Sequence, residues 1–167
     1  MSKLYILVGL VLLVLGCSYS VHMTAYPHLK SLHIGTFENK STEYSLEEEL
    51  LESLTGSFKS SNQLKLVDLA PDCRLDGEIV DYTNKIYSYD SGEKVKEYEL
   101  KILFNIQLTD LIQNEVLYEK ENLLLKEVYL SEATASSGTQ ATSEEAARSM
   151  VFDDLYQTIM ENSFQSW

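Results

Sequence analysis

The side chains best suited to nucleophilic and metal chemistry are few in this chain of 167 residues. The two cysteines, Cys17 and Cys73, lie far apart, and the histidines, His22, His28 and His33, all lie in the N-terminal part. A catalytic cysteine needs a histidine base beside it, and no CxxC or HxxxH spacing indicates a metal site. The residue types alone leave the cysteines as a disulfide pair, buried apolar groups or modification sites.

Paired carboxylates are the other candidates for chemistry. Glu78 with Asp81, and Asp153 with Asp154, have the residue types that general acid–base catalysis uses. The chain has 26 acidic residues against 13 basic ones, a net charge of −13, so such pairs are expected by chance. We therefore expect no enzyme and no cofactor. The acidic balance also argues against nucleic acid as a partner, since phosphate binding needs clustered Lys and Arg.

The N-terminus predicts a targeting segment. A short positive start around Lys3 is followed by an apolar run from Leu4 to Leu15. A run of about a dozen residues is typical of a signal peptide and is too short to cross a bilayer comfortably. A buried core helix is the alternative, and the absence of a polar face disfavours it.

The apolar run ends in four residues that resemble a bacterial lipobox: Val14, Leu15, Gly16 and Cys17. The resemblance implies a lipoprotein signal peptide over 1–16, a diacylglyceryl group on the Cys17 thiol, and cleavage between Gly16 and Cys17. The new amino group would also be acylated, for example with palmitate. Several acyl chains give stable membrane anchoring, which one chain does not.

A lipidated Cys17 leaves Cys73 without an intrachain partner, so the disulfide alternative fails. Cys73 is then predicted to be a small buried apolar group on the same face of an extended segment as Leu75. Ser18 stands where lipoproteins retained at the inner membrane commonly have Asp, which implies the periplasmic face of the outer membrane. Loss of residues 1–16 removes one basic residue and leaves a net charge of −14.

After a tether at 17–28, one domain is predicted over 29–167. Its strands are predicted at 29–37, 64–67, 73–89, 98–108 and 115–130, with a hairpin turn at 90–92. A change in the apolar pattern between Ile79 and Val80 predicts a bulge. Capping boxes at 45–48 and 142–145 predict the starts of two amphipathic helices. The small polar residues of 131–143 predict a flexible loop.

This order, β-α-β-β-β-β-α, predicts an α+β fold, a two-layer α/β sandwich. Two amphipathic helices pack on one face of a mixed, mostly antiparallel sheet of four to five strands.

Short motifs in this order resemble the LptE-type lipopolysaccharide-assembly lipoproteins. They are the lipobox cysteine with Ser-Tyr-Ser, the segments 34–41, 64–67 and 75–82, the long alternating hairpin and the last, acid-capped helix. The resemblance covers nearly the whole mature chain, and none of its motifs is catalytic. The positions that carry it within the domain are Phe37, Glu38, Asn39, Gly77 and Tyr82.

The resemblance implies a structural partner, or plug, of the LptD barrel in lipopolysaccharide assembly at the outer membrane. Basic side chains of the family would contact lipopolysaccharide, and Lys94, Lys96 and Lys101 are the candidates here. The charge of −14 favours the barrel-partner role over direct lipopolysaccharide binding. The alternative is a periplasmic regulatory or secretion-pore lipoprotein, such as a cell-wall synthase activator. The antiparallel segment from 73 to 130 favours the LptE-like interpretation.

Overall fold

The structure is a computed structural model that describes residues 26–131 and 141–164. The residues that resemble a lipobox and the predicted signal peptide lie outside the described residues, as does most of the loop predicted at 131–143. The elements are β1 (Ser31–Ile34), β2 (Glu38–Asn39), α2 (Leu46–Ser61), β3 (Lys65–Leu66), β4 (Cys73–Tyr89), β5 (Val95–Asp110), β6 (Glu115–Leu130) and α3 (Glu144–Ser163).

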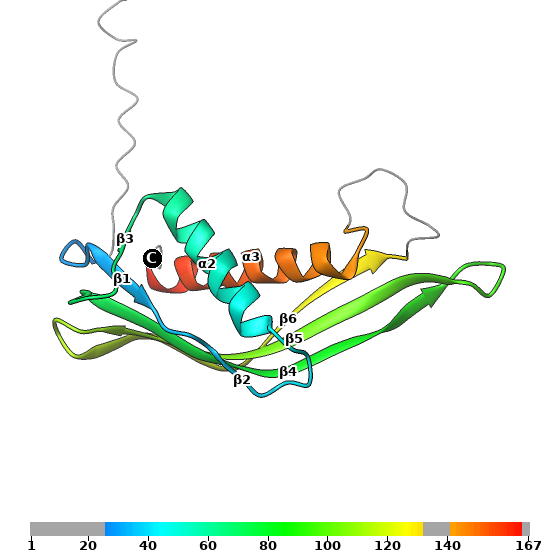
Figure 1. Ribbon diagram of the computed structural model, residues 1–167, viewed down its shortest axis with the longest axis horizontal. Helices are drawn as coiled ribbons and strands as arrows, with labels where there is room; N and C mark the ends of the chain where they lie inside the picture. The colour runs from blue at the N-terminus through cyan, green and yellow to red at the C-terminus, as the bar shows by residue number, and fades with distance from the viewer. Residues whose placement is uncertain (1–25, 132–140, 165–167) are drawn as a thin grey trace, which may run out of the picture.

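One mixed sheet contains all six strands. Its order is β3-β1-β4-β5-β6, and β2 pairs with β4 on the same side as β1. The pairs made by β1, β2 and β3 are parallel, whereas the long strands β4, β5 and β6 pair antiparallel. Both helices lie on one face of this sheet (Figure 1). The predicted two-layer α+β fold is therefore confirmed.

The first predicted strand, 29–37, is shorter than expected, because β1 covers only Ser31–Ile34, and a further short strand, β2, follows the predicted range at Glu38–Asn39. The total is therefore six strands rather than four to five. Ile34 pairs with Leu75, and Glu38 pairs with Glu78. The four-residue step between Ile34 and Glu38 thus lies opposite a three-residue step on β4. The extra residue interrupts the pairing, as in a β-bulge.

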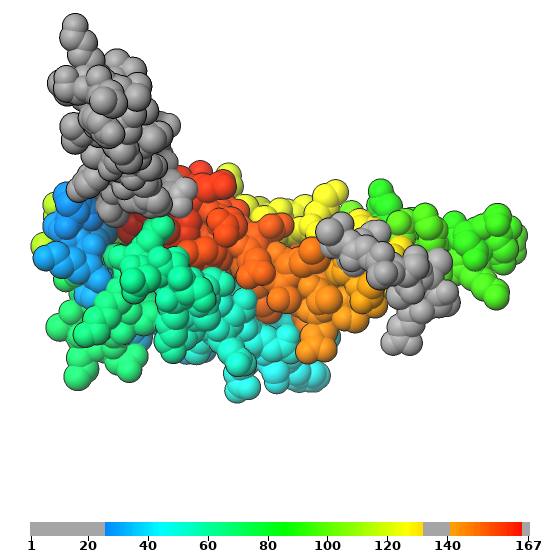
Figure 2. Space-filling model, turned by 90° about the horizontal axis from the view of Figure 1, so that it is seen from above, coloured from blue at the N-terminus to red at the C-terminus, as the bar shows by residue number. Residues whose placement is uncertain are grey.

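The antiparallel part of the sheet follows the sequence prediction closely. β4 and β6 have the predicted limits, and the register of β4 against β5 shifts between Ile79 and Asp81, where the bulge was expected. The Asp90 carboxylate closes the β4–β5 hairpin by accepting bonds from the backbone N–H of Gly92 (2.8 Å) and Lys94 (2.9 Å). The hairpin extends past the helical layer (Figures 1 and 2).

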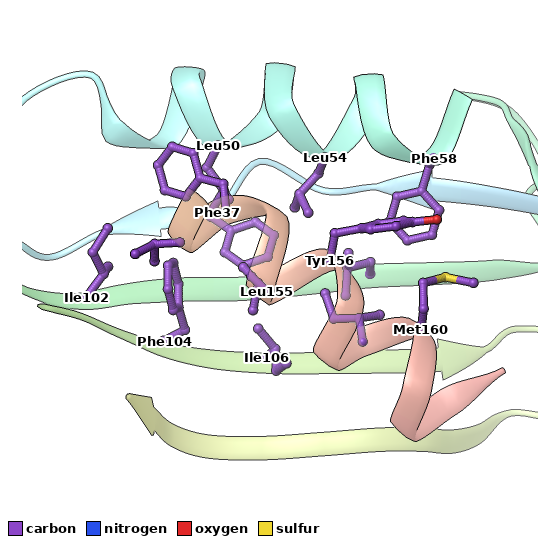
Figure 3. Close-up of a cluster of buried hydrophobic side chains, with 14 of the residues drawn as sticks. Phe37, Leu50, Leu54, Phe58, Ile102, Phe104, Ile106, Leu155, Tyr156 and Met160 are labelled. Carbon is purple, nitrogen blue, oxygen red and sulfur yellow. The ribbon is translucent and has the colours of Figure 1, made fainter. Parts of the chain in front are cut away.

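The core fills the space between the helices and the sheet (Figure 3). From α2, Leu50, Leu54 and Phe58 point toward the sheet because a four-residue spacing keeps them on one side of the helix. The rings of Phe58 and Tyr156 meet edge to face, with centroids 4.9 Å apart, and join α2 to α3. Phe104 and its inward neighbours on β5 complete the layer.

The two predicted helix starts differ in outcome. The second helix, α3, begins within the predicted box 142–145, but its cap is the second residue of the box: Ser143 accepts a 3.1 Å hydrogen bond from the Ala146 N–H. The capping box predicted at Ser45 is wrong, because Ser45 has left-handed backbone angles (φ 62°) and its side chain makes no capping bond. An N-cap residue needs an extended backbone to aim its oxygen at the free N–H groups of the first turn.

Candidate functional site

Phe37 and Gly77, two positions of the family-like motif, lie against each other. A Cβ atom at Gly77 would lie 2.4 Å from Cε1 of Phe37 and 2.5 Å from the carbonyl oxygen of Asn105. The absence of a side chain at 77 therefore gives the buried ring of Phe37 its place against β4. This part of the motif is structural.

Asn39 and Glu38, the next motif positions, stabilise the connection into α2 and the edge of the sheet. The Asn39 side chain accepts from the Ser41 N–H (3.0 Å) and donates to the Glu43 carbonyl and to Glu47 Oε2, both at 2.8 Å. Glu38 is exposed and lies 3.7 Å from Lys40 Nζ. These bonds hold the loop before α2, where the predicted serine cap is missing.

Tyr82, the last motif position, attaches α3 to the sheet. Its hydroxyl donates to Glu144 Oε1 in the first turn of the helix. Burial raises the pKa of the Tyr82 hydroxyl, and the neighbouring Glu144 carboxylate raises it further. Tyr82 is therefore a neutral hydrogen-bond donor at neutral pH.

Arg148 is a structural residue that sequence reasoning missed. It lies one turn into α3, and its guanidinium approaches Glu43 (3.4 Å) before α2 and Glu49 (3.2 Å) within α2. It thus joins the two helices by charge. The available signal was a single arginine in a helix that is apolar around much of its circumference, where a charge needs a partner.

The three lysines proposed as ligand contacts do not form one site. Lys94 is exposed in the β4–β5 turn, Lys96 lies beside that turn at a shift in the β4–β5 register, and Lys101 lies five residues farther along β5. Lys101 pairs with Glu99, and Lys96 Nζ lies 3.7 Å from the Glu97 carboxylate. These positions give no concentrated positive charge.

Cys73 lies opposite a carboxylate that binds a histidine, but its environment opposes a role as a nucleophile. His28 Nε2 is 2.5 Å from Oδ2 of the buried Asp110, which pairs with Cys73 across β4 and β5. Burial, with the charges of Asp72 and Asp110, raises the pKa of the Cys73 thiol to about 12. A reactive cysteine needs the opposite shift. The prediction that Cys73 is a buried apolar group is confirmed.

The acidic pairs are also part of the surface. Glu78 bonds Lys40 Nζ (2.7 Å), and Asp81 is exposed on β4, while Asp153 and Asp154 are exposed on α3. Within 26–131 and 141–164, no group of three metal-binding side chains gathers. No helix of the described part is both long and apolar enough to cross a membrane.

The face of the sheet opposite the helices is the most extensive candidate surface. No helix of the described residues covers it (Figure 1). We call it the open face. A shallow groove of about 460 Å³ runs across it, between the β2 edge and β6. The polar and charged side chains that line it are Thr36, Glu38, Asp76, Glu78, Asn105, Gln107, Glu119, Lys120 and Glu121.

Ion pairs hold much of the charge on the open face. Lys40 bonds Glu78, Arg74 Nη2 is 2.8 Å from Asp76, and Lys101 bonds Glu99. The open face is therefore polar, and its ion pairs hold the charged side chains in place although they remain accessible to solvent. Such a surface suits an aqueous or polar partner better than an apolar one.

Comparisons with solved structures place the fold among known ones. A hypothetical protein from Chlamydia trachomatis aligns with a TM-score of 0.53 at 13% identity, over 79% of this chain and 94% of that one. A Neisseria meningitidis lipoprotein has a TM-score of 0.46 and 11% identity, over 79% and 99%. The rare lipoprotein B from Shewanella oneidensis has a TM-score of 0.44 and 20% identity, over 77% and 94%. At these identities only the first likeness is informative, and it concerns the fold alone.

Comparison with the sequences of curated proteins gives no match. A family model does match: the LptE lipopolysaccharide-assembly model covers residues 29–163, which include every described strand and helix. The match confirms the resemblance carried by the motifs around Phe37 and Gly77. The chain belongs to the LptE lipopolysaccharide-assembly family.

Proposed function

We propose that the protein is a lipid-anchored structural partner of an LptD-like β-barrel, acting in lipopolysaccharide assembly at the outer membrane. The observation that carries this proposal is the family match over 29–163, in a chain whose residues 14–17 resemble a lipobox before the domain. The family is non-catalytic, and we propose neither enzyme activity nor any cofactor beyond the lipid on Cys17. The same proposal makes residues 1–16 a cleaved signal peptide and 17–28 a tether.

The open face gives this role a physical basis. The interior of an outer-membrane barrel is polar, so a protein lodged there needs a polar surface that keeps its shape. The covered face supplies rigidity through the core around Phe104 and Leu155. The open face supplies charged and amide side chains already held by ion pairs, such as Lys40 with Glu78. We therefore assign the open face to the wall of the barrel.

Direct lipopolysaccharide binding is the weaker role for this chain. Lipopolysaccharide is anionic, and the whole chain carries 26 acidic residues against 13 basic ones. Lys101 already pairs with Glu99, and Lys94 and Lys96 lie elsewhere. The field around the protein thus opposes an anionic ligand.

Anchoring is tested by Cys17→Ala. In cells fed labelled palmitate, the wild-type chain should take up the label and fractionate with the outer membrane. Cys17→Ala should lose both, because the thiol is the proposed acylation point. Cys73→Ala is the matched control and should keep the label. A Cys17→Ala protein that still labels and stays in the outer membrane contradicts the proposal.

Partnership is tested with a photo-crosslinking amino acid placed on each side of the molecule. Glu119 lines the groove of the open face, and Glu161 is exposed on α3. We expect the probe at Glu119 to capture an LptD-like barrel and the probe at Glu161 to capture much less. Capture of a cell-wall synthase at Glu119, with no barrel, supports the regulatory-lipoprotein alternative instead.

A further inference from the structure

We propose that the end of the sheet where β5 turns into β6 rests on the phospholipid surface of the membrane. This inference builds on the proposed lipid anchor at Cys17. It adds a second, non-covalent membrane contact made by the folded domain, and so sets which way the domain points.

Four large apolar side chains are exposed at this end. In the turn, Leu111 and Ile112 are 45% and 58% exposed, Val116 at the start of β6 is 46% exposed, and Leu69 before β4 is 87% exposed. We call these four residues the apolar end. Water is an unfavourable environment for such side chains, so several of them exposed together indicate a surface that something else covers.

Backbone hydrogen bonds hold the apolar end together. The Leu111 N–H donates to the Asp72 carbonyl (2.8 Å), which joins the β5–β6 turn to the connection that contains Leu69. The Asp72 carboxylate in turn accepts from the N–H groups of Lys30 (2.8 Å) and Ser31 (2.9 Å). Figure 1 shows both connections at the end of the sheet where β1 begins. The apolar side chains thus come from one fixed unit, not from independent loops.

Asp110 sets the direction of the turn. Its Oδ1 accepts from the N–H of Ile112 (2.8 Å) and of Gln113 (2.9 Å), while Oδ2 bonds His28 Nε2. Because the carboxylate occupies the inner side of the turn, the side chains of Leu111 and Ile112 are left on its outer side. The conformation is already formed, so contact with a membrane costs little ordering of the chain.

The position of the proposed anchor indicates that a membrane, and not another protein, covers the apolar end. His28, which bonds Asp110, lies only eleven positions after Cys17 in the sequence. Nine peptide units separate Cys17 from Tyr26, the first described residue, and they span at most about 30 Å when extended. The 16 residues of β5 extend about 50 Å at about 3.3 Å per residue, so the opposite end of the sheet is not held near the anchor.

Charges of both signs lie at this end, where Asp68 and Glu115 are exposed next to Leu69 and Val116, and the lysines are the groups that can meet lipid phosphates. Lys30 and Lys65 are both exposed beside the apolar end, and the Lys65 N–H bonds the Lys30 carbonyl (2.9 Å). Amphipathic surfaces of this kind bind at the boundary between headgroups and acyl chains, with apolar groups inward and lysines at the phosphates. In the full chain, the net charge keeps the rest of the domain away from anionic headgroups.

The experiment places a fluorophore at each end of the full, lipidated chain. Ile112→Cys and Tyr87→Cys each add one exposed thiol for an environment-sensitive dye, and buried Cys73 does not compete for it. Tyr87 lies in the opposite, hairpin end and is the matched control. The labelled proteins are reconstituted on vesicles of phosphatidylethanolamine and phosphatidylglycerol that contain spin-labelled lipid, a quencher of the dye.

We expect quenching to be several-fold stronger at 112 than at 87. Equal quenching at both sites, or stronger quenching at 87, overturns the membrane contact while leaving the anchor intact. Flotation of the same vesicles separates the two proposals: a protein that does not float at all refutes the anchor and, with it, this inference. The triple variant Leu111→Ser, Ile112→Ser, Val116→Ser should still float but should lose the extra quenching of a dye at Leu69→Cys.

Discussion

The two faces of the sheet are built from alternate residues of the same strands, yet they are organised differently. On β5, the inward residues from Leu100 to Leu108 are buried, whereas the outward ones, including Leu103 and Gln107, are partly exposed. The covered face is apolar and close-packed, and the open face is polar and held by ion pairs. This contrast indicates that the covered face provides the stability, which leaves the open face available for a partner.

Truncation of neighbouring residues on β5 should give the largest difference in stability between the two faces. Phe104→Ala removes a fully buried ring, and we expect a loss of about 3–5 kcal/mol in the free energy of unfolding. Leu103→Ala, its neighbour on the open face, should cost about 1 kcal/mol or less, because less apolar area leaves water there on folding. Urea unfolding of both variants measures the difference. Similar losses would mean that the open face is also covered in the folded protein.

Two glycines make the next comparison. Gly77→Ala forces a Cβ against Phe37 and the Asn105 carbonyl, so we expect a loss of about 1–3 kcal/mol from overpacking. Gly56→Ala, on the exposed side of α2, meets no atom within 4 Å and should gain about 0.5–1 kcal/mol through helix propensity. Thermal unfolding should give a lower Tm than wild type for Gly77→Ala and a higher Tm for Gly56→Ala if the covered face is as tightly packed as described. A neutral Gly77→Ala would show that Phe37 moves aside freely.

The two faces can also be compared through the pH dependence of the stability that one carboxylate on each face contributes. Burial raises the pKa of Asp110, but the bonds from His28 and from the N–H groups of Gln113 and Ile112 outweigh it, and the net pKa is lowered. On the open face, the hydrogen bond from Lys40 lowers the pKa of Glu78. For each, the stabilisation is complete above the unfolded pKa, about 4, and disappears as the pH falls through the lower folded value.

We therefore expect Asp110→Asn to lower the denaturant midpoint at neutral pH, with the gap to wild type closing below about pH 4. Glu78→Gln should change the profile less, since solvent screens an exposed ion pair. Denaturant midpoints across pH measure both. A gap for Asp110→Asn that stays constant in acid would show that the carboxylate charge is not what stabilises the β5–β6 turn.

The covered face was largely predictable from sequence, because periodicity reports burial directly. The alternation along β5, the parity change after Ile79 and the four-residue spacing from Leu46 to Phe58 gave the long strands, the bulge and α2. The interruption after Ile34 was not predictable, because a single extra residue against β4 leaves no trace in the apolar pattern.

Side-chain partners were the least predictable part of the candidate site. Ser45 has the right type and spacing for a cap, but local type does not fix backbone angles, and the loop is held by Asn39 instead. Arg148 and Tyr82 find partners far away in sequence. The family resemblance singled out Asn39, Gly77 and Tyr82, whereas only the fold shows that their contacts are structural.

The smallest expected effect on stability is also the sharpest test of the open face. Lys101→Ala breaks an exposed pair with Glu99 and should cost less than about 1 kcal/mol, since screening and side-chain entropy offset such pairs. Lys59→Ala, on the exposed last turn of α2, should cost as little. If the open face meets a barrel wall, co-purification of the barrel should fall for Lys101→Ala and stay unchanged for Lys59→Ala, because Glu99 would then keep only its longer contact with Lys126 (3.5 Å) and would present more negative charge to the partner. Equal recovery with both variants would leave the open face a solvated surface and would move the partner contact to the helices.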